Sequence, residues 1–315
     1  MCCEDYIFFH CNSMKSFSNA YLCRNKYYDM ELTLDCSLMG NEALANDINA
    51  NTLYVGKIGM MNQYKQKPLI MISNDDGIMS SGIKQLAKVA MRYGDVCVVA
   101  PDRSYSGMSH AITTERPLVV EEYEVIEGVR GYKVTGTPVD CIKLGIHTFV
   151  NRKPDIILSG INHGANTSSS VHYSGTMAVA REAALMGITG VGFSLVHYGE
   201  VDDWSQAEQI VERVLSWVVN TPLPKGVFYN VNIPYISDVK GLKACRQTEG
   251  RWTEKPTKFV SPFGKQYYWL EGEFVNDSPQ DTTTDEHYIK EGYATICPCK
   301  IDVCDYKFLS EMIFD

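Results

Sequence analysis

The chain has 315 residues, of which 45% are hydrophobic and 21% are charged, and its formal net charge is −9. This composition supplies enough apolar material for a globular core and excludes disordered and collagen-like chains. The negative charge opposes binding to a nucleic-acid polymer or an anionic membrane, although one small phosphate ester can still bind at a local site.

The first 66 residues show neither a sustained strand period nor a sustained helix period. The chain opens with acidic residues where a secretion signal is basic, and no run approaches the ~20 apolar residues of a membrane span. We therefore expect a cytoplasmic protein. We expect residues 1–66 to be an N-terminal extension that is poorly ordered or a start-site artefact, because Met60 and Met61 stand just before the first core segment. A small accessory module is the alternative.

From Pro68 onward, strand patterns alternate with helix patterns. Short apolar runs predict strands at 69–73, 96–100, 155–159, 191–195 and 228–233. Apolar periodicity predicts helices at 83–91 and 205–218, the latter opening on a capping box formed by Ser205 and Glu208. An alanine-rich run predicts a further helix at 174–186. This alternation predicts an α/β fold with a Rossmann-like, mostly parallel sheet and helices on both faces.

The alternation stops near residue 240, so we expect a catalytic core at 67–240 and a C-terminal arm and tail at 241–315. Pro262-Phe-Gly264 and Tyr267-Tyr-Trp-Leu270 indicate a β-hairpin arm with exposed aromatic side chains. A two-stranded hairpin is only marginally stable alone, so these aromatics are expected to pack on something, either a second subunit or their own domain.

Eleven cysteines are spread along the chain. In a reducing compartment, Cys297-Pro-Cys299 with Cys304 could form a redox or metal cluster. Zinc sites usually need a second paired set, so free thiols are the favoured interpretation.

Polar residues follow three of the predicted strands, at the edge where open parallel sheets bind ligands. They are Asn74, Asp75 and Asp76 after the first strand, Ser106 and His110 after the second, and Asn162 and Asn166 after the third. Adjacent carboxylates form a doubly negative site that suits a hard divalent cation such as Mg²⁺ or Mn²⁺.

A predicted helix start adds a phosphate-binding feature. Ser174, Gly175 and Thr176 offer backbone N–H groups and hydroxyls to an anion. Taken singly, these residues are typical of a helix cap, and the Asn-Asp-Asp-Gly segment is typical of a tight turn. Their convergence at one edge of the sheet favours a site, because turns need not collect there.

Other phosphate chemistries on this architecture do not match the spacing. The Asp-x-Asp of haloacid-dehalogenase phosphatases is replaced here by Asp75-Asp76-Gly77, and no acceptor Asp follows the strand at 155–159 as in a response-regulator receiver. The sequence also lacks the P-loop, the dinucleotide-binding Gly-x-Gly-x-x-Gly and the hydrolase Gly-x-Ser-x-Gly.

The segment from about Pro68 to about Pro298 resembles the survival protein E family in the order, spacing and identity of its motifs. The motifs are Ser73-Asn-Asp-Asp-Gly-Ile78, Val99-Ala-Pro-Asp-Arg103, Ser106-Gly-Met-Ser-His-Ala-Ile-Thr113, Gly136-Thr-Pro-Val-Asp-Cys141, Ser159-Gly-Ile-Asn-His-Gly-Ala-Asn166, Tyr173-Ser-Gly-Thr176, Val260-Ser-Pro-Phe-Gly264 and Gly292-Tyr-Ala-Thr-Ile296.

The resemblance implies a metal-dependent 5′/3′-nucleotidase that hydrolyses nucleoside monophosphates. It implies that one divalent cation, Mg²⁺ or Mn²⁺, is held by Asp75, Asp76, Ser106 and Asn162. Plausible phosphate contacts are Asn74, Asn166, Ser174, Gly175 and Thr176. The resemblance also suggests that the C-terminal arm reaches a second subunit, which predicts a homodimer or homotetramer.

Several alternatives stay open at this point. His110 is a candidate proton donor to the leaving alkoxide, and an equally weighted alternative is a hydrogen bond that orients its loop. A broad phosphomonoesterase or exopolyphosphatase is a second enzyme hypothesis. A non-catalytic nucleotide-binding sensor is the hypothesis from another class.

Overall fold

The computed structural model describes residues 6–7, 21–24, 30–33 and 67–314, except 222. The chain divides into two compact units, Met1–Gln66 and Lys67–Asp315. In the first unit, β1 (Tyr6–Ile7), β2 (Tyr21–Arg24) and β3 (Met30–Thr33) pair as antiparallel strands. The expectations of poor order and of a start near Met60 and Met61 fall on residues outside the described ranges.

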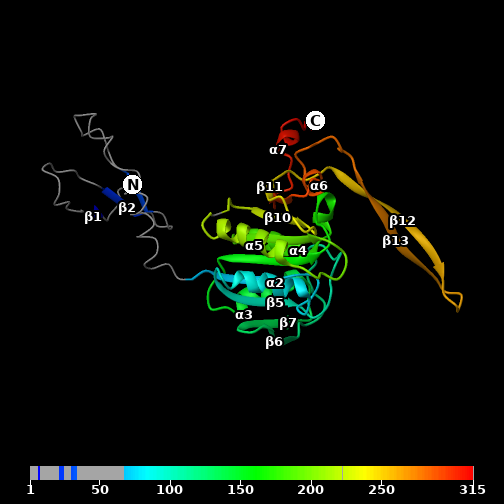
Figure 1. Ribbon diagram of the computed structural model, residues 1–315, viewed down its shortest axis with the longest axis horizontal. Coiled ribbons are helices and arrows are strands. Elements are labelled where there is room, and N and C mark those ends of the chain that lie inside the picture. Colours follow the sequence, from blue (N-terminus) through cyan, green and yellow to red (C-terminus); the bar gives the residue numbers. More distant parts are fainter. Residues whose placement is uncertain (1–5, 8–20, 25–29, 34–66, 222, 315) are drawn as a thin grey trace. The chain divides into compact units, whose positions relative to one another are not determined.

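Within residues 67–314, nine strands form one sheet in the order β11-β14-β10-β9-β8-β4-β5-β7-β6 (Figure 1). Their bounds are β4 (Leu69–Ser73), β5 (Asp95–Pro101), β6 (Val120–Ile126), β7 (Val129–Val134), β8 (Ile156–His163), β9 (Thr189–Val196), β10 (Val227–Pro234), β11 (Leu242–Ala244) and β14 (Ala294–Lys300). The strands from β10 to β7 are parallel, whereas β6 is antiparallel to β7 and β14 to β10. The predicted mostly parallel sheet is confirmed.

Helices cover both faces of this sheet, as predicted (Figure 1). They are α2 (Ser81–Ala90) and α5 (Ser205–Val218) on one face, and α3 (Pro138–Thr148) and α4 (Gly175–Leu185) on the other. Strand β4 needs cover on both faces because its apolar side chains alternate. Ile70 and Ile72 pack into the apolar cluster under α2 and α5, whereas Met71 packs into the cluster under α3 and α4. No helix in the described ranges is long and apolar enough to cross a membrane.

The chain changes direction across the sheet at β4 and β8. From β4 it builds outward through β5 and β7, and it then returns through α3 to place β8 on the other side of β4. A crevice at such a reversal, beyond the carboxyl ends of the strands, is where open α/β sheets bind ligands. The loops after β4 and β8 therefore define the candidate site.

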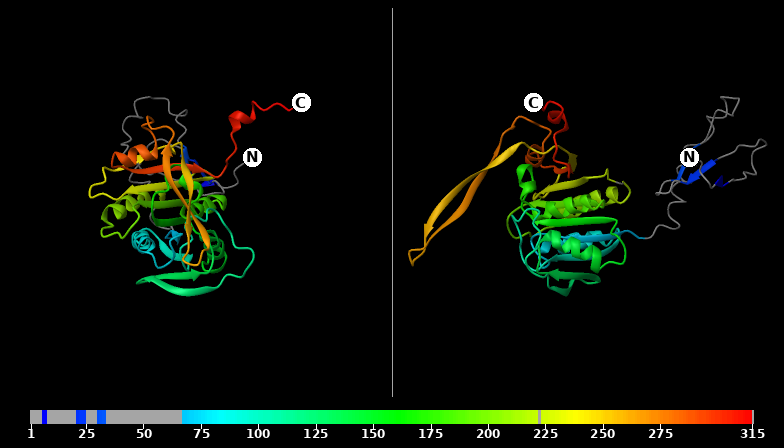
Figure 2. Two further views of the ribbon diagram at one scale, coloured as in Figure 1. Left: turned by 90° about the vertical axis from the view of Figure 1, so that its right-hand side faces the viewer. Right: turned by 180° about the vertical axis from the view of Figure 1, so that it is seen from behind.

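The predicted C-terminal hairpin is present. Strands β12 (Gly250–Val260) and β13 (Gln266–Asn276) pair as an antiparallel ribbon that projects from the rest of the second unit (Figure 2). The central sheet itself continues beyond residue 240, where the sequence analysis placed the end of the core, because β11 and β14 both join it. The short helices α6 (Asp285–Lys290) and α7 (Tyr306–Leu309) complete this region.

One predicted local motif is wrong. Ser205 lies inside α5 rather than capping it, and its backbone N–H donates to Asp203 Oδ1 over 2.8 Å. Glu208 instead accepts a hydrogen bond from Lys88 on α2 over 2.8 Å. A capping box does occur at α3, where the side chains and backbones of Thr137 and Asp140 bond reciprocally. The Ser-x-x-Glu pattern forms no capping box at α5, because α2 packs against α5 and Lys88 of α2 binds the Glu208 carboxylate.

The sequence analysis missed β6, β7 and α3. Strand β6 is an edge strand with mostly exposed or half-buried residues, so it lacks the continuous apolar run that marks the inner strands. Strand β8 is also longer than predicted, because it continues past Ser159 to His163 after a shift in its register with β9. Asn162 therefore lies on the sheet itself rather than in a loop.

Candidate active site

The carboxylate of Asp75 is bound at the N-terminus of α4. Asp75 lies two residues after the end of β4 and is almost completely buried. Its Oδ2 accepts from the Gly175 backbone N–H over 3.0 Å, and its Oδ1 accepts from the Thr176 hydroxyl over 2.5 Å. Ser174 caps the same helix by accepting from the Met177 N–H over 3.0 Å. A carboxylate is favoured here by the orphan N–H groups and the positive end of the helix dipole.

Asp76 connects the same loop to β8. Its Oδ2 accepts from the His163 backbone N–H over 3.2 Å and lies 3.4 Å from His163 Nδ1. The two neighbouring carboxylates are thus anchored on different elements, Asp75 on α4 and Asp76 on β8. Sequence reasoning assigned His163 no role, and only the extension of β8 brings its backbone to Asp76.

Burial and mutual repulsion raise the pKa of Asp75 to about 6. Removal from water is the larger cause and the charge of Asp76 is the second, while hydrogen bonds from Thr176 act in the opposite direction. Near neutral pH the site therefore holds two carboxylates whose repulsion a bound cation would relieve.

Asn162 carries a neutral side-chain oxygen one residue before His163, which binds Asp76. Its side-chain Nδ2 donates to the Gly164 carbonyl over 2.9 Å, which fixes the amide with Oδ1 pointing the other way. Asn162 is buried, and the next residue, His163, is the one that binds Asp76. The oxygen is thus available as an acceptor or as a ligand for a hard cation.

The loop that carries Ser106 passes over the Asp75 turn. The Tyr105 backbone N–H donates to the Asp75 carbonyl over 2.7 Å, which places Ser106 one residue away. The Ser106 hydroxyl is exposed and lies 3.0 Å from the Ser104 hydroxyl. The structure therefore brings the Ser106 backbone to the site while its side chain contacts Ser104.

Two predicted phosphate contacts are engaged by the protein itself. Asn74 closes the turn, because its Nδ2 donates to the Gly77 carbonyl and to Ser80 Oγ and its Oδ1 accepts from the Gly77 N–H. Asn166 donates from Nδ2 to Ser194 Oγ over 2.8 Å and its backbone N–H donates to Asn232 Oδ1. Both side chains hold the loops in place.

His110 is bonded to a buried carboxylate on α4. Its Nε2 lies 2.8 Å from Glu182 Oε2, and Lys143 on α3 donates to Glu182 Oε1 over 2.5 Å. The hydrogen bond with His110 is the main cause that lowers the pKa of Glu182. His110 Nδ1 is buried and has no hydrogen-bond partner among the described residues.

Glu182 and Lys143 were missed by sequence reasoning. A signal was available for Glu182, because it lies three and four residues after Val179 and Ala178, on the buried side of an alanine-rich helix. A lone carboxylate on a buried face needs a partner. The sequence could not indicate that His110 and Lys143 supply it.

The donor atoms of the Asp75–Asp76 site fit a hard divalent cation. In the described part of the chain, His, Cys, Asp and Glu side chains do not gather in threes as a metal-binding group. Two carboxylates with neutral amide and hydroxyl oxygens remain, and this oxygen-only set is the type that Mg²⁺ and Mn²⁺ accept while retaining water molecules.

Comparisons with known proteins identify the family. The family profile described as Survival protein SurE matches residues 70–254. The chain is 42% identical over 248 residues to a protein of Phocaeicola vulgatus named 5′-nucleotidase SurE, covering 79% of this chain and 96% of that protein. It is 44% identical over 250 residues to the protein of the same name from Cytophaga hutchinsonii, covering 78% and 96%.

A solved structure gives the same result at the level of the fold. The crystal structure of SurE protein from Aquifex aeolicus superposes with a TM-score of 0.67 at 31% identity, covering 78% of this chain and 98% of that one. The residues matched by the family profile, 70–254, include Asp75, Asp76, Asn162 and the start of α4, which carry the candidate site. The chain therefore belongs to the Survival protein SurE family.

Proposed function

We propose that this chain is a metal-dependent 5′-nucleotidase that releases phosphate from nucleoside monophosphates and also accepts 3′-nucleotides. The observation that carries the proposal is the Asp75–Asp76 pair, anchored between α4 and β8. Relatives that the match covers over 96% of their own length bear the name 5′-nucleotidase SurE. Their names support the same phosphomonoester chemistry here.

In this proposal the cation ligands are Asp75, Asp76, Asn162 and Ser106. A bound Mg²⁺ or Mn²⁺ supplies charge neutralisation at the phosphoryl group and lowers the pKa of a coordinated water molecule. The chain's own part is to hold the ligands rigidly. Asp75 is fixed by Gly175 and Thr176, and Asp76 is fixed by the His163 N–H. Such fixed carboxylates need little reorganisation when the substrate arrives.

The loops around the pair are proposed to bind and orient the phosphate. Ser174, Gly175 and Thr176 form the helix start that anchors Asp75, and the positive end of the helix dipole there favours an anion beside the carboxylate. Asn74 and Asn166 keep these loops in position through the hydrogen bonds described above. His110 is proposed as the proton donor to the leaving alkoxide, held by Glu182.

We further propose that the arm formed by β12 and β13 contacts a second copy of the chain in a homodimer or homotetramer. Tyr268 and Trp269 on this ribbon are 58% and 63% exposed, and Leu270 is 74% exposed. Large apolar side chains that gather on one projecting element favour a protein interface. Exchange of such an element between identical subunits is a low-cost route to assembly.

A phosphate-release assay tests the function. The purified protein is incubated with 5′-AMP and Mn²⁺, with excess chelator as the control, and then with 3′-AMP, a sugar phosphate and polyphosphate. We expect steady turnover of both nucleotides that the chelator abolishes. Nucleotide binding without release would indicate a sensor, and faster release from polyphosphate or a sugar phosphate would indicate a broader phosphatase.

A further inference from the structure

Three cysteines gather on the edge of the central sheet, away from the Asp75–Asp76 site. Cys297 and Cys299 lie two residues apart on β14, so their side chains share one face of the strand. Cys245 follows β11, which runs parallel to β14 with Ala244 opposite Ile296. The register therefore brings Cys245 beside Cys297, and the Cys245 N–H donates to the Ile296 carbonyl over 3.1 Å.

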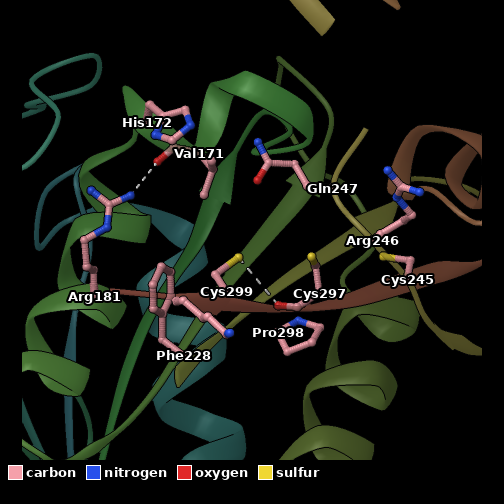
Figure 3. A pocket seen from close by; sticks show the side chains of 11 residues that line it. Val171, His172, Arg181, Phe228, Cys245, Arg246, Gln247, Cys297, Pro298 and Cys299 are labelled. Carbon is pink, nitrogen blue, oxygen red and sulfur yellow. Dashed lines mark hydrogen bonds between the residues drawn. The ribbon is translucent and has the colours of Figure 1, made fainter. Parts of the chain in front are cut away.

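These thiols line a pocket of about 320 Å³, which we call the thiol pocket. Figure 3 shows Cys297 between Cys299 and Cys245, with all three sulfur atoms on the same side of β14. All three are free cysteines, and Cys297 is buried while the other two are half-buried.

The walls of the thiol pocket are cationic. Arg181 on α4, Arg246 and Lys300 line it together with His172. Arg246 is paired with Glu249 and Asp281, but Arg181 pairs with no carboxylate of the described residues and donates to the Val171 carbonyl. Positive charge beside a thiol favours the thiolate, which is the nucleophilic form.

The thiols also act on one another. The Cys299 thiol donates to the Cys297 backbone carbonyl over 3.7 Å. The neighbouring thiols of Cys245 and Cys299 lower the pKa of Cys297 below its ordinary value, and the proximity of Cys297, with burial, raises the pKa of both neighbours. A cysteine whose pKa is lowered beside a second thiol is the arrangement in which one cysteine attacks and a neighbour resolves.

We propose that the thiol pocket is a peroxide-oxidation site in which Cys297 is the attacking residue and Cys245 the resolving residue. Cys245 is preferred to Cys299 as the partner because neighbouring strands lie about 4.8 Å apart, within the Cα separations of disulfides. Residues two apart on one extended strand lie about 6.6 Å apart, near the upper limit.

The chemistry balances with a hydroperoxide as the oxidant. The Cys297 thiolate attacks one peroxide oxygen, the O–O bond breaks, and the other oxygen leaves and takes up a proton, forming water when the oxidant is hydrogen peroxide. Cys297 becomes a sulfenic acid. Cys245 then loses its proton and attacks the sulfenic sulfur, so that the S–S bond forms and the hydroxyl leaves as a second water. Each hydrogen peroxide thus oxidises two thiols to one disulfide.

Peptide mapping of the full-length protein tests this proposal without any variant. The reduced protein is treated with hydrogen peroxide in the presence of a chelator, alkylated, and digested with trypsin under non-reducing conditions. Cleavage after Lys243, Arg246, Lys290 and Lys300 leaves Cys245 in peptide 244–246 and Cys297 in peptide 291–300. We expect these two peptides to be joined. Cys304, which is exposed and outside the pocket, serves as the internal comparison and should be oxidised at least about 10-fold more slowly.

Two variants assign the partners. Cys299→Ser should keep the joined peptides, whereas Cys245→Ser should lose them and accumulate a sulfenic acid on Cys297 that a dione reagent traps. Joining of Cys297 to Cys299 alone, or oxidation of Cys304 while Cys245 and Cys297 stay alkylated, would overturn the proposal. Cys297 and Cys299 share peptide 291–300, so fragmentation of the joined wild-type peptides identifies which of the two is bonded to Cys245 and decides the outcome if a variant does not fold.

Discussion

An alanine at position 175 would place its Cβ 2.7 Å from the Cβ of Asp75 and 3.0 Å from its Oδ2. Glycine at this position is therefore what allows the carboxylate to sit against the first N–H groups of α4. We expect Gly175→Ala to push Asp75 out of place and lower the turnover of 5′-AMP at least about 10-fold, because the carboxylate loses its anchored position. Turnover and thermal unfolding are measured together. Gly199→Ala is the matched control, because this glycine is exposed and an added Cβ would meet only the ring of His197. It should leave turnover and thermal unfolding unchanged.

Removing the charge of Asp75 should abolish activity without unfolding the protein. Asp75→Asn keeps the side-chain volume and removes one anionic ligand of the proposed cation, so we expect turnover to fall about 100-fold or more. Isothermal titration with Mn²⁺ should show weaker binding. Asp202→Asn, on an exposed loop, is the control. Near wild-type turnover at low Mn²⁺ would exclude Asp75 as a ligand.

The raised pKa of Asp75 predicts an unusual dependence of stability on pH. The folded protein holds the proton up to about pH 6, whereas an ordinary Asp releases it near 3.8. As the pH rises from about 3.8 to about 6, the free energy of unfolding of the metal-free protein should therefore fall by about 2 to 3 kcal/mol. Urea unfolding at pH 4 and pH 7 measures this loss. We expect Asp75→Asn to lack it, and a pH dependence equal to that of the wild type would show that another group is responsible.

The leaving group distinguishes the two roles of His110. A proton donor is needed for the alkoxide of 5′-AMP but not for 4-nitrophenolate, which leaves without a proton. We expect His110→Asn to lower the turnover of 5′-AMP about 100-fold and that of 4-nitrophenyl phosphate only slightly. His147→Asn, at an exposed position on α3, is the control. Equal losses on both substrates would instead identify His110 as a residue that positions its loop through Glu182.

Shortening the arm should change the assembly. Lys255 lies opposite Glu271 in the ribbon, so residues 256–270 can be replaced by a short glycine linker without moving the ends apart. We expect light scattering to show a change from a dimer or larger species to a monomer, because the exposed aromatic side chains are lost. Circular dichroism and Mn²⁺ binding report whether the central sheet remains folded. A wild-type protein that is already monomeric at micromolar concentration would contradict the proposed interface.

Much of the architecture could be predicted from the sequence alone. The buried run at 69–73 and the periodic helices α2 and α5 follow from local composition, because a strand covered on both faces must be apolar throughout and a surface helix must repeat its apolar residues every three or four positions. Helix α4 was predicted from its alanine-rich composition. The aromatic ribbon was predicted for the same reason. In each case the decisive information lies within about fifteen consecutive residues.

The composition of the site could be predicted, but its contacts could not. The sequence places Asp75 and Thr176 at the same edge of a parallel sheet, yet only the packing of α4 against the turn after β4 joins the carboxylate to the hydroxyl. The bonds of Glu182 with His110 and Lys143 likewise link residues 72 and 39 positions apart. Such pairs depend on how three elements pack together, and no local pattern records that.

The capping box and the thiols show the same division. Ser205 and Glu208 have the residue types of a capping box, but in the folded protein Glu208 accepts a hydrogen bond from Lys88 instead. Cys297 and Cys299 looked like free thiols next to Cys304, and the parallel pairing of β11 with β14 brings Cys245 to them instead. The sequence determined which elements form and which residue types they carry, because propensity and burial are local. The tertiary structure decided which side chains meet, because strand order and helix packing join segments that are distant along the chain.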